Sequence, residues 1–299
     1  MSFSTIKLPI PSLNFHLWEP CNMRCKFCFA TFQDVKQTVL PKGHLPKESA
    51  IKLMYLICST NVEKITFAGG EPTLCPWLYD LIAIAKSHNK TTMVVTNGSR
   101  IDKEWINKYE EVLDWITLSV DSINDKANIY TGRAITGKKP INVKSYLTIC
   151  NYIMESKIRL KINTVVSAFN KNENLSKFIN KVNPKRWKIL QALPIKGQND
   201  LCISKFTISD SEFQNYVQSQ NVNQQVIIVT ESNDDMTNSY LMIDPAGRFY
   251  QNTNSRYEYS IPILDEGIIK AAKSIDIDVE KFNRRGGRYE WKTGHNIKD

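Results

Sequence analysis

Three cysteines, Cys21, Cys25 and Cys28, have the spacing C-x3-C-x2-C and directly follow a strand-like segment. We expect them on the first loop at the carboxyl end of that strand, where β/α folds build active sites. Thiolates on one short loop can converge on a metal centre, and three protein ligands leave a coordination position open for chemistry. A structural zinc site with His16 or His44 as a fourth donor is one alternative, and inert buried thiols are another.

A second motif, AGGEP at residues 68–72, ends the next strand-like segment. Its glycines permit close backbone approach and unusual φ angles. Polar stretches TNGS at 96–99 and SVDS at 119–122 end the two strands that follow. Such dipeptides are ordinary turn residues when they stand alone, so they gain meaning only beside the cysteine triad.

Polar residues also occupy alternate positions of several predicted strands, although parallel strands covered by helices are usually apolar throughout. This polar face carries Asn14 and His16 in the first strand, Lys64 in the second, Arg159, Lys161 and Asn163 in the fifth, and Arg186 and Lys188 in the sixth. A buried unpaired cation is costly. The inward cations therefore predict an anion between them. Lys64, Lys161, Arg186 and Lys188 together carry four positive charges, which matches the charge of a nucleoside triphosphate near pH 7. The alternative for each is a strand-end side chain that reaches solvent.

The elements that would position these residues alternate regularly. Strand-like segments lie at 13–18, 64–68, 92–96, 115–120, 159–166 and 187–193, and helix-like segments at 47–58, 76–87, 102–108, 143–154, 172–181 and 209–219. Such alternation predicts parallel strands with right-handed crossovers. Six units are too few for a closed eight-stranded barrel, which leaves a partial barrel or an open doubly wound sheet.

The pattern changes after Cys202, where short strands are predicted at 225–230, 240–244 and 248–251. We divide the chain into an N-terminal extension (1–11), a β/α core (12–205) and a C-terminal α+β extension (206–299). The basic and aromatic stretch at 283–291 is typical of a mobile tail or of a lid that closes over an anionic ligand.

Composition excludes several classes of protein. The chain has 299 residues, of which 42% are hydrophobic and 23% charged, as in a globular protein. It lacks both an apolar run of membrane-spanning length and a signal peptide, so a cytoplasmic location is expected. The net charge of +9 is compatible with an anionic partner. The seven cysteines are odd in number, which argues against a disulfide framework.

The cysteine triad followed one strand later by GGEP resembles the radical S-adenosylmethionine (SAM) enzymes. Further segments resemble the viperin family of these enzymes, and the short form resembles its prokaryotic members. These segments are NFH at 14–16, KIN at 161–163, RWK at 186–188, SYL at 239–241 and RGGRY at 285–289. The resemblance implies a partial (β/α)6 barrel with a C-terminal α+β extension. It also implies dehydration of CTP, UTP or GTP to the 3′-deoxy-3′,4′-didehydro form, an antiviral nucleotide that terminates RNA chains.

The resemblance also implies roles for individual residues. A [4Fe–4S] cluster would bind Cys21, Cys25 and Cys28. SAM would contact Gly69, Gly70, Glu71, Asn97, Ser119 and Arg133. The triphosphate and ribose would contact Asn14, Lys64, Lys161, Asn163, Arg186 and Lys188. Tyr240 would return a hydrogen atom to the sugar, or else is simply a half-buried strand tyrosine.

Expected partners are the nucleotide and an electron donor such as flavodoxin or ferredoxin, and we expect a monomer that binds neither nucleic acid nor membrane. Two other functions stay open. One is a radical SAM enzyme acting on another nucleotide or a peptide, although residues 203–299 contain no cysteine for an auxiliary cluster. The other is a nucleic-acid-binding module with a structural metal, against which the inward direction of the cations counts.

Overall fold

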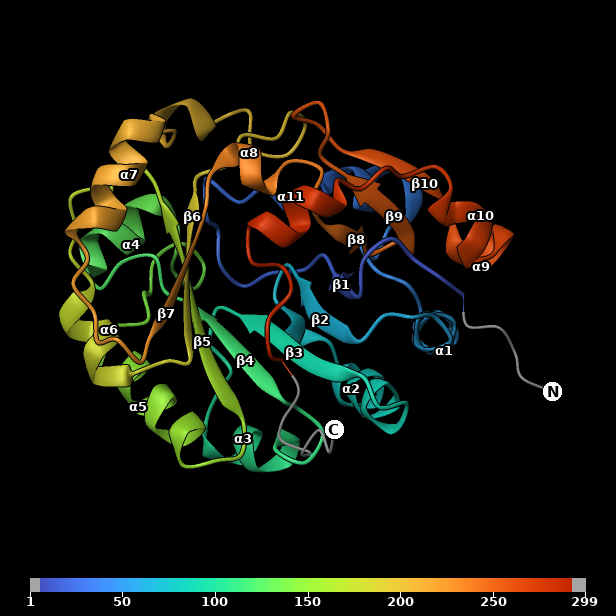
Figure 1. The fold of residues 1–299 in the computed structure, drawn as a ribbon, viewed down its shortest axis with the longest axis horizontal. Coiled ribbons are helices and arrows are strands. Elements are labelled where there is room, and N and C mark those ends of the chain that lie inside the picture. Colours follow the sequence, from blue (N-terminus) through green and yellow to red (C-terminus); the bar gives the residue numbers. More distant parts are fainter. Residues whose placement is uncertain (1–5, 292–299) are drawn as a thin grey trace.

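One ten-stranded sheet runs through residues 6–291, which are the residues that the computed structural model describes (Figure 1). Its strand order is β10-β9-β8-β1-β2-β3-β4-β5-β6-β7. The strands are β1 (Ser12–Trp18), β2 (Lys64–Gly69), β3 (Thr91–Thr96), β4 (Trp115–Ser119), β5 (Arg159–Val166), β6 (Arg186–Gln191), β7 (Ile227–Glu231), β8 (Leu241–Ile243), β9 (Arg248–Gln251) and β10 (Glu258–Pro262). Strands β1 to β7 are parallel to their neighbours, β8 is parallel to β1, and β9 and β10 are antiparallel. The sheet is open, because β10 and β7 form its two edges.

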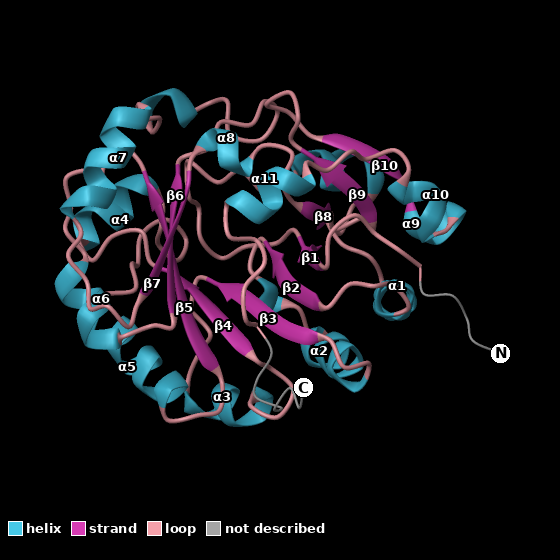
Figure 2. Cartoon of the chain, viewed as in Figure 1, coloured by secondary structure: helices cyan, strands magenta, loops and turns pink. Residues whose placement is uncertain are grey.

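Helices cover the outer side of this curved sheet (Figure 2). The longer ones are α1 (Lys47–Cys58), α2 (Leu78–Ser87), α3 (Lys103–Tyr109), α4 (Asp125–Thr131), α5 (Val143–Met154), α6 (Ser176–Val182) and α7 (Asp210–Ser219). The chain also has shorter helices, of which α11 lies on the inner side: η1 (Val35–Val39), η2 (Pro72–Leu74), η3 (Ile203–Lys205), α8 (Asn233–Met236), α9 (Ile263–Glu266), α10 (Ile268–Ala272) and α11 (Val279–Arg284). No helix within the described residues is both long and apolar enough to cross a bilayer.

The predicted partial barrel of β/α units is confirmed, with two differences. Helix α4 lies in a stretch that the sequence pattern indicates as a polar loop. It is short and largely exposed, so it lacks an apolar stripe, but the side chain of Asn124 caps its start and Gly132 ends it in the left-handed conformation. In addition, β7 adds a seventh parallel strand beside β6, while β8 joins the opposite edge beside β1. The C-terminal segment therefore extends both edges of the sheet.

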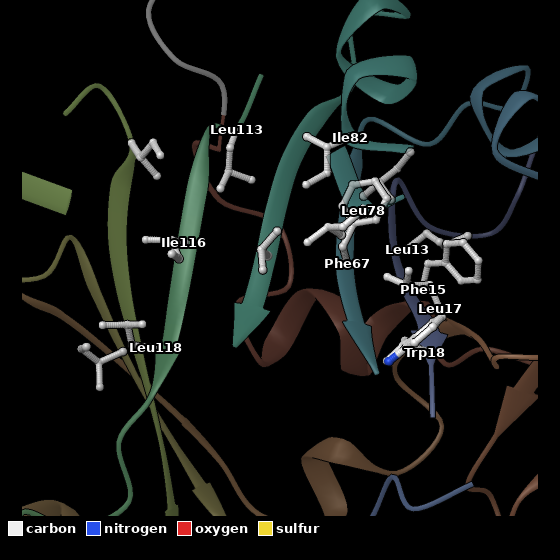
Figure 3. Close-up of a cluster of buried hydrophobic side chains, with 14 of the residues drawn as sticks. Leu13, Phe15, Leu17, Trp18, Phe67, Leu78, Ile82, Leu113, Ile116 and Leu118 are labelled. Atoms are coloured by element: carbon white, nitrogen blue, oxygen red, sulfur yellow. The ribbon is translucent and has the colours of Figure 1, made fainter. Parts of the chain in front are cut away.

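Alternation along β1 separates the hydrophobic core from the polar side of the sheet. Leu13, Phe15 and Leu17 are buried beneath the helices, in the cluster drawn in Figure 3. Phe67 of β2 belongs to the same cluster, as does Leu78 of α2. The intervening residues of β1 point to the other side of the sheet, as period two requires.

Candidate active site

A cavity lies on the inner side of the sheet, and side chains from β1 to β6 line it. Helix α11 and the chain that follows it run across this side (Figure 1). The lining includes every residue for which the sequence predicts a role: Asn14, Cys21, Cys25, Cys28, Lys64, Gly69, Gly70, Glu71, Asn97, Ser119, Arg133, Lys161, Asn163, Arg186, Lys188 and Tyr240. The fold thus gathers residues that are spread from position 14 to position 240 of the chain around one space.

The cysteine loop is held by backbone contacts to two glycine-containing segments. The amide of Glu71 donates to the carbonyl of Pro20 at 3.0 Å, and the amide of Arg24 donates to the carbonyl of Gly132 at 3.0 Å. A Cβ atom on Gly70 would lie 2.6 Å from the carbonyl oxygen of Pro20, closer than real Cβ contacts allow. The close backbone approach predicted for these glycines is confirmed, since a Cβ atom on Gly69 would likewise overlap the carbonyl oxygen of Trp18. Neither glycine has a positive φ. Glycine is therefore needed at both positions because any side chain would overlap the backbone of residues 18–20.

The three thiols line the same cavity, but their arrangement differs from that of a mononuclear site. No three or more His, Cys, Asp or Glu side chains within residues 6–291 are grouped so that they could hold one metal ion. In a [4Fe–4S] cluster each cysteine binds a different iron, so the sulfurs need not meet at one point. Burial raises the pKa of Cys21 to about 11 and that of Cys25 to about 12, so metal binding must displace the thiol protons. The donor set and its shielding fit a multi-iron cluster.

The two histidines proposed as zinc donors have other surroundings. His44 stacks on Trp18 with ring centroids 3.9 Å apart, and its Nδ1 lies 2.9 Å from the carbonyl oxygen of Leu45. His16 is buried against Phe32, and desolvation lowers its pKa to about 3, so the ring is neutral. Within the part of the chain that the structure describes, the Nδ1 of His16 has no hydrogen-bond partner.

Glu71 ties the motif after β2 to the end of β3. Its buried carboxylate accepts hydrogen bonds from the hydroxyl of Thr96 at 2.7 Å and from the amide of Asn97 at 2.8 Å. It also accepts from the amide and the hydroxyl of Thr73. The side chain of Asn97 in turn donates to Asn22 of the cysteine loop at 2.9 Å. These bonds fix the rim of the cavity near the cysteines.

Arg133 also lines the cavity near the cysteines and is anchored by an ion pair. Its Nε donates to Asp121 at 2.6 Å, and Asp121 accepts a further bond from the amide of Val165 at 2.8 Å. The guanidinium also lies 5.7 Å from the ring centre of Phe27, a residue that stands between Cys25 and Cys28 in the sequence. Arg133 and Asp121 therefore place a compensated charge pair beside the cysteine loop.

Three buried cations, Lys64, Lys161 and Arg186, form the other end of the cavity. None of them forms an ion pair with a described residue. Desolvation and the neighbouring cations lower the pKa of both lysines well below the usual value. Nearby, the Oδ1 of Asn163 and the Nε of Arg186 are buried and have no hydrogen-bond partner among residues 6–291. Unpaired buried polar atoms are rare in proteins, so this end is built for a polar, anionic ligand.

A buried carboxylate joins the remaining predicted residues. Glu231 at the end of β7 forms an ion pair with Lys188 and accepts a hydrogen bond from the hydroxyl of Tyr240. Lys188 also donates to that hydroxyl at 2.9 Å. Arg285 donates to Glu231 at 3.0 Å and lies 3.7 Å from the ring centre of Tyr240. Burial alone would raise the pKa of Glu231, but Lys188 and Arg285 outweigh it and lower the pKa to about 2.

Sequence reasoning missed Glu231 and gave Arg285 no role. Glu231 directly follows the strand predicted at 225–230, and a single acid at the end of a strand is a weak signal. Arg285 opens the RGGRY segment. Five buried or half-buried cations lie at this end of the cavity: Lys64, Lys161, Arg186, Lys188 and Arg285. The one carboxylate, Glu231, offsets one of these charges, so four positive charges remain.

The chain after α11 packs over the cations. Lys64 lies 4.7 Å from the ring centre of Tyr289 and 4.9 Å from that of Trp291. Arg186 lies 4.0 Å from the ring centre of Tyr289. The carbonyl of the buried Trp291 accepts a bond from the indole of Trp115 at 2.9 Å. Part of the predicted lid segment thus covers this end of the cavity, and residues 292–299 lie outside the described part of the chain.

Comparison with known proteins agrees with this site. The profile of the radical SAM superfamily matches residues 18–182. The chain is 52% identical over 287 residues to an "S-adenosylmethionine-dependent nucleotide dehydratase" of Lacinutrix mariniflava, covering 96% of this chain but only 60% of that protein. It is 50% identical to a protein of the same name from Flammeovirga pacifica, covering 95% of this chain and 97% of the relative. A Danio rerio relative named "S-adenosylmethionine-dependent nucleotide dehydratase RSAD2" is 35% identical, covering 94% and 78% of the two chains.

Solved structures show the same fold at low identity. The enzyme anSMEcpe with bound AdoMet matches with a TM-score of 0.64 at 16% identity, covering 92% of this chain and 82% of that one. Streptococcus suis SuiB bound to S-adenosylmethionine matches with a TM-score of 0.61 at 17% identity, covering 82% and 60%.

Proposed function

This chain belongs to the radical SAM superfamily and, within it, to the S-adenosylmethionine-dependent nucleotide dehydratases, and on that basis we propose that it dehydrates a ribonucleoside triphosphate at the ribose. CTP, UTP or GTP would lose water and yield the 3′-deoxy-3′,4′-didehydro nucleotide, which terminates viral RNA synthesis. The observation that carries the proposal is the group of buried cations without carboxylate partners, Lys64, Lys161 and Arg186, in the cavity that the cysteines also line.

The proposed cofactors are a [4Fe–4S] cluster on Cys21, Cys25 and Cys28 and SAM beside it. When bound, they would supply the one-electron chemistry in which SAM is cleaved and a hydrogen atom is then taken from the ribose 4′ carbon. Contacts to SAM would come from Gly69, Gly70, Glu71, Asn97, Ser119 and Arg133. Because the carboxylate of Glu71 accepts four hydrogen bonds from Thr73, Thr96 and Asn97, its role would include holding the backbone of this rim.

The nucleotide would lie along the sheet with its triphosphate on Lys64, Lys161, Arg186 and Lys188. Lys64 begins β2 and Gly69 ends it, a span of roughly 16 Å at the rise of a strand. A triphosphate held at the cationic end therefore directs the sugar toward the cysteine end. Asn14 and the unpaired Oδ1 of Asn163 would contact the ribose. Such clamping matters because a misplacement of about 1 Å can cost on the order of 100-fold in rate.

Tyr240 would return a hydrogen atom after the 3′ hydroxyl has left as water. Its hydroxyl lies between Lys188 and Glu231 and its ring lines the cavity. We further propose that residues 12–205 hold the cofactors and that residues 206–299 complete the nucleotide site. The proposed setting is a cytoplasmic monomer that receives electrons from a flavodoxin or ferredoxin and binds neither membranes nor nucleic acid.

The test is an anaerobic assay of the reconstituted enzyme with SAM, dithionite and each of the four ribonucleoside triphosphates in turn. Release of 5′-deoxyadenosine with one triphosphate, together with a nucleotide product lighter by one water, is the expected result and also identifies the base. Deoxyadenosine formed equally with and without every nucleotide would overturn the nucleotide substrate.

A further inference from the structure

Two exposed aromatic residues meet on the surface beside the cysteine loop. Tyr130 in α4 is 54% exposed and Phe169 in the loop after β5 is 38% exposed, and their ring centroids are 4.7 Å apart. Ile129, next to Tyr130, is 43% exposed. Exposed apolar side chains that gather in one place commonly mark an interaction site.

This surface connects to the cysteine loop through aromatic contacts. The ring of Phe169 lies 4.9 Å from that of Phe206, and Phe206 lies 5.6 Å from Phe27. Phe27 stands between Cys25 and Cys28 in the sequence. From the other side, the amide of Lys26 donates to the carbonyl of Thr131 at 2.9 Å, which joins the cysteine loop to the end of α4. The exposed aromatic pair is therefore the outer layer over the proposed cluster ligands.

The charge beside the aromatic pair is positive. The ammonium of Lys26 lies 4.8 Å from the ring centre of Tyr130. Lys26 and Lys205, which precedes Phe206, are exposed and form no ion pair within residues 6–291. A basic rim around exposed aromatics favours a partner with an acidic surface, because opposite charges speed the encounter.

We propose that the surface formed by Lys26, Ile129, Tyr130 and Phe169, the Tyr130 patch, docks an acidic electron-carrier protein. This inference rests on the proposed function, in which each cleavage of SAM requires one electron from outside the chain. In the docked complex the carrier is oxidised by one electron and the cluster is reduced by one, without any bond being made or broken. A small patch of this composition suits a partner that must leave after each transfer.

The experiment measures reduction of the cluster directly. The reconstituted holoenzyme is mixed anaerobically with fully reduced flavodoxin at low and high salt, and bleaching of the cluster absorbance is followed by stopped flow. The variants are Tyr130→Ser and Lys26→Gln. Matched controls are Tyr55→Ser and Lys52→Gln in α1, since Tyr55 is 52% exposed and Lys52 is also exposed.

Loss of one central aromatic from an interface typically weakens it by about tenfold or more. We therefore expect Tyr130→Ser to slow reduction by flavodoxin about tenfold and Lys26→Gln to weaken its salt dependence, while both controls behave as the parent. Reduction by dithionite, which needs no docking, should be unchanged in all four. Equal rates in Tyr130→Ser and Tyr55→Ser would overturn the proposal. The proposal would also be overturned if Tyr130→Ser changed the oligomeric state, or abolished binding to anionic vesicles, without slowing reduction by flavodoxin.

Failure of the proposed function would look different. In that case flavodoxin would still reduce the cluster of the parent enzyme faster than that of Tyr130→Ser, but no nucleotide would stimulate formation of deoxyadenosine with either reductant.

Discussion

The carboxylate of Glu231 accepts a hydrogen bond from the hydroxyl of Tyr240 and forms an ion pair with Lys188. The side chain is fully buried, and Arg285 completes its surroundings from the chain after α11. A residue proposed for hydrogen transfer is thus fixed by the same acid that orders two cations of the triphosphate end.

Replacement of this acid should reduce stability in a pH-dependent way. The pKa of Glu231 is lowered from 4.5 to about 2, so the ionised carboxylate contributes on the order of 3 kcal/mol to the free energy of unfolding. Since the folded-state pKa is the lower one, this contribution is complete above about pH 4.5 and is lost as the pH falls toward 2. Urea unfolding of the parent and of Glu231→Gln should show a gap at pH 7 that narrows at pH 3. A constant gap would mean that the charge of Glu231 is not what stabilises the fold.

Tyr240→Phe separates cleavage of SAM from formation of product. Without the hydroxyl, nucleotide-dependent release of deoxyadenosine should continue, but the yield of dehydrated nucleotide per deoxyadenosine should fall at least tenfold. Tyr250→Phe is the control, because Tyr250 is a buried tyrosine whose hydroxyl has no hydrogen-bond partner among the described residues. Mass spectrometry measures both deoxyadenosine and the dehydrated nucleotide. A full yield of dehydrated nucleotide from Tyr240→Phe would show that the Tyr240 hydroxyl does not return the hydrogen atom.

Much of the site was predictable because its signals are local. Alternation within a strand already indicates that Lys161 and Asn163 share a face, and the cavity lining agrees with it. The spacing of the cysteines likewise identifies their loop. Glu231 could not be found in this way, because its partners Lys188 and Arg285 are 43 and 54 residues away. Only the parallel pairing of β7 with β6 brings the acid to the lysine.

Prediction of the fold from the sequence is limited in the same way. Strand and helix positions follow from periodicity, which is local, but the order of strands at the sheet edges does not. Nothing in the segment at 240–244 reveals that β8 pairs with β1. That pairing places Tyr240 beside the start of the first strand.

Lys161→Met should stabilise the protein and weaken nucleotide binding at once. The buried ammonium forms no hydrogen bond or ion pair within the described residues, and desolvation lowers its pKa well below the usual value. Replacing an uncompensated buried charge with an apolar side chain of similar length should add about 1 kcal/mol to the free energy of unfolding without ligand. The same change should raise the Kd for the triphosphate about tenfold or more.

Thermal unfolding with and without nucleotide tests both effects, the gain in stability of the free protein and the loss of nucleotide affinity. Lys144→Met on α5 is the control, since Lys144 is exposed and should leave both quantities unchanged. A Lys161→Met protein that is less stable without nucleotide would show that the ammonium has a structural partner in the free enzyme.

Gly70→Ala should prevent assembly of the cluster while leaving the sheet folded. The added Cβ would overlap the carbonyl oxygens of Glu19 and Pro20, which are backbone atoms and cannot turn aside as a flexible side chain would. The loop that carries Cys21 must then move away from β2. We expect the far-ultraviolet circular dichroism to match the parent, and the iron content after reconstitution to fall several-fold. Gly197→Ala provides the comparison, because its φ of +85° strains the backbone but its Cβ meets nothing within 4 Å. Iron content should stay near the parental value in Gly197→Ala, and normal iron loading of Gly70→Ala would show that the loop tolerates displacement.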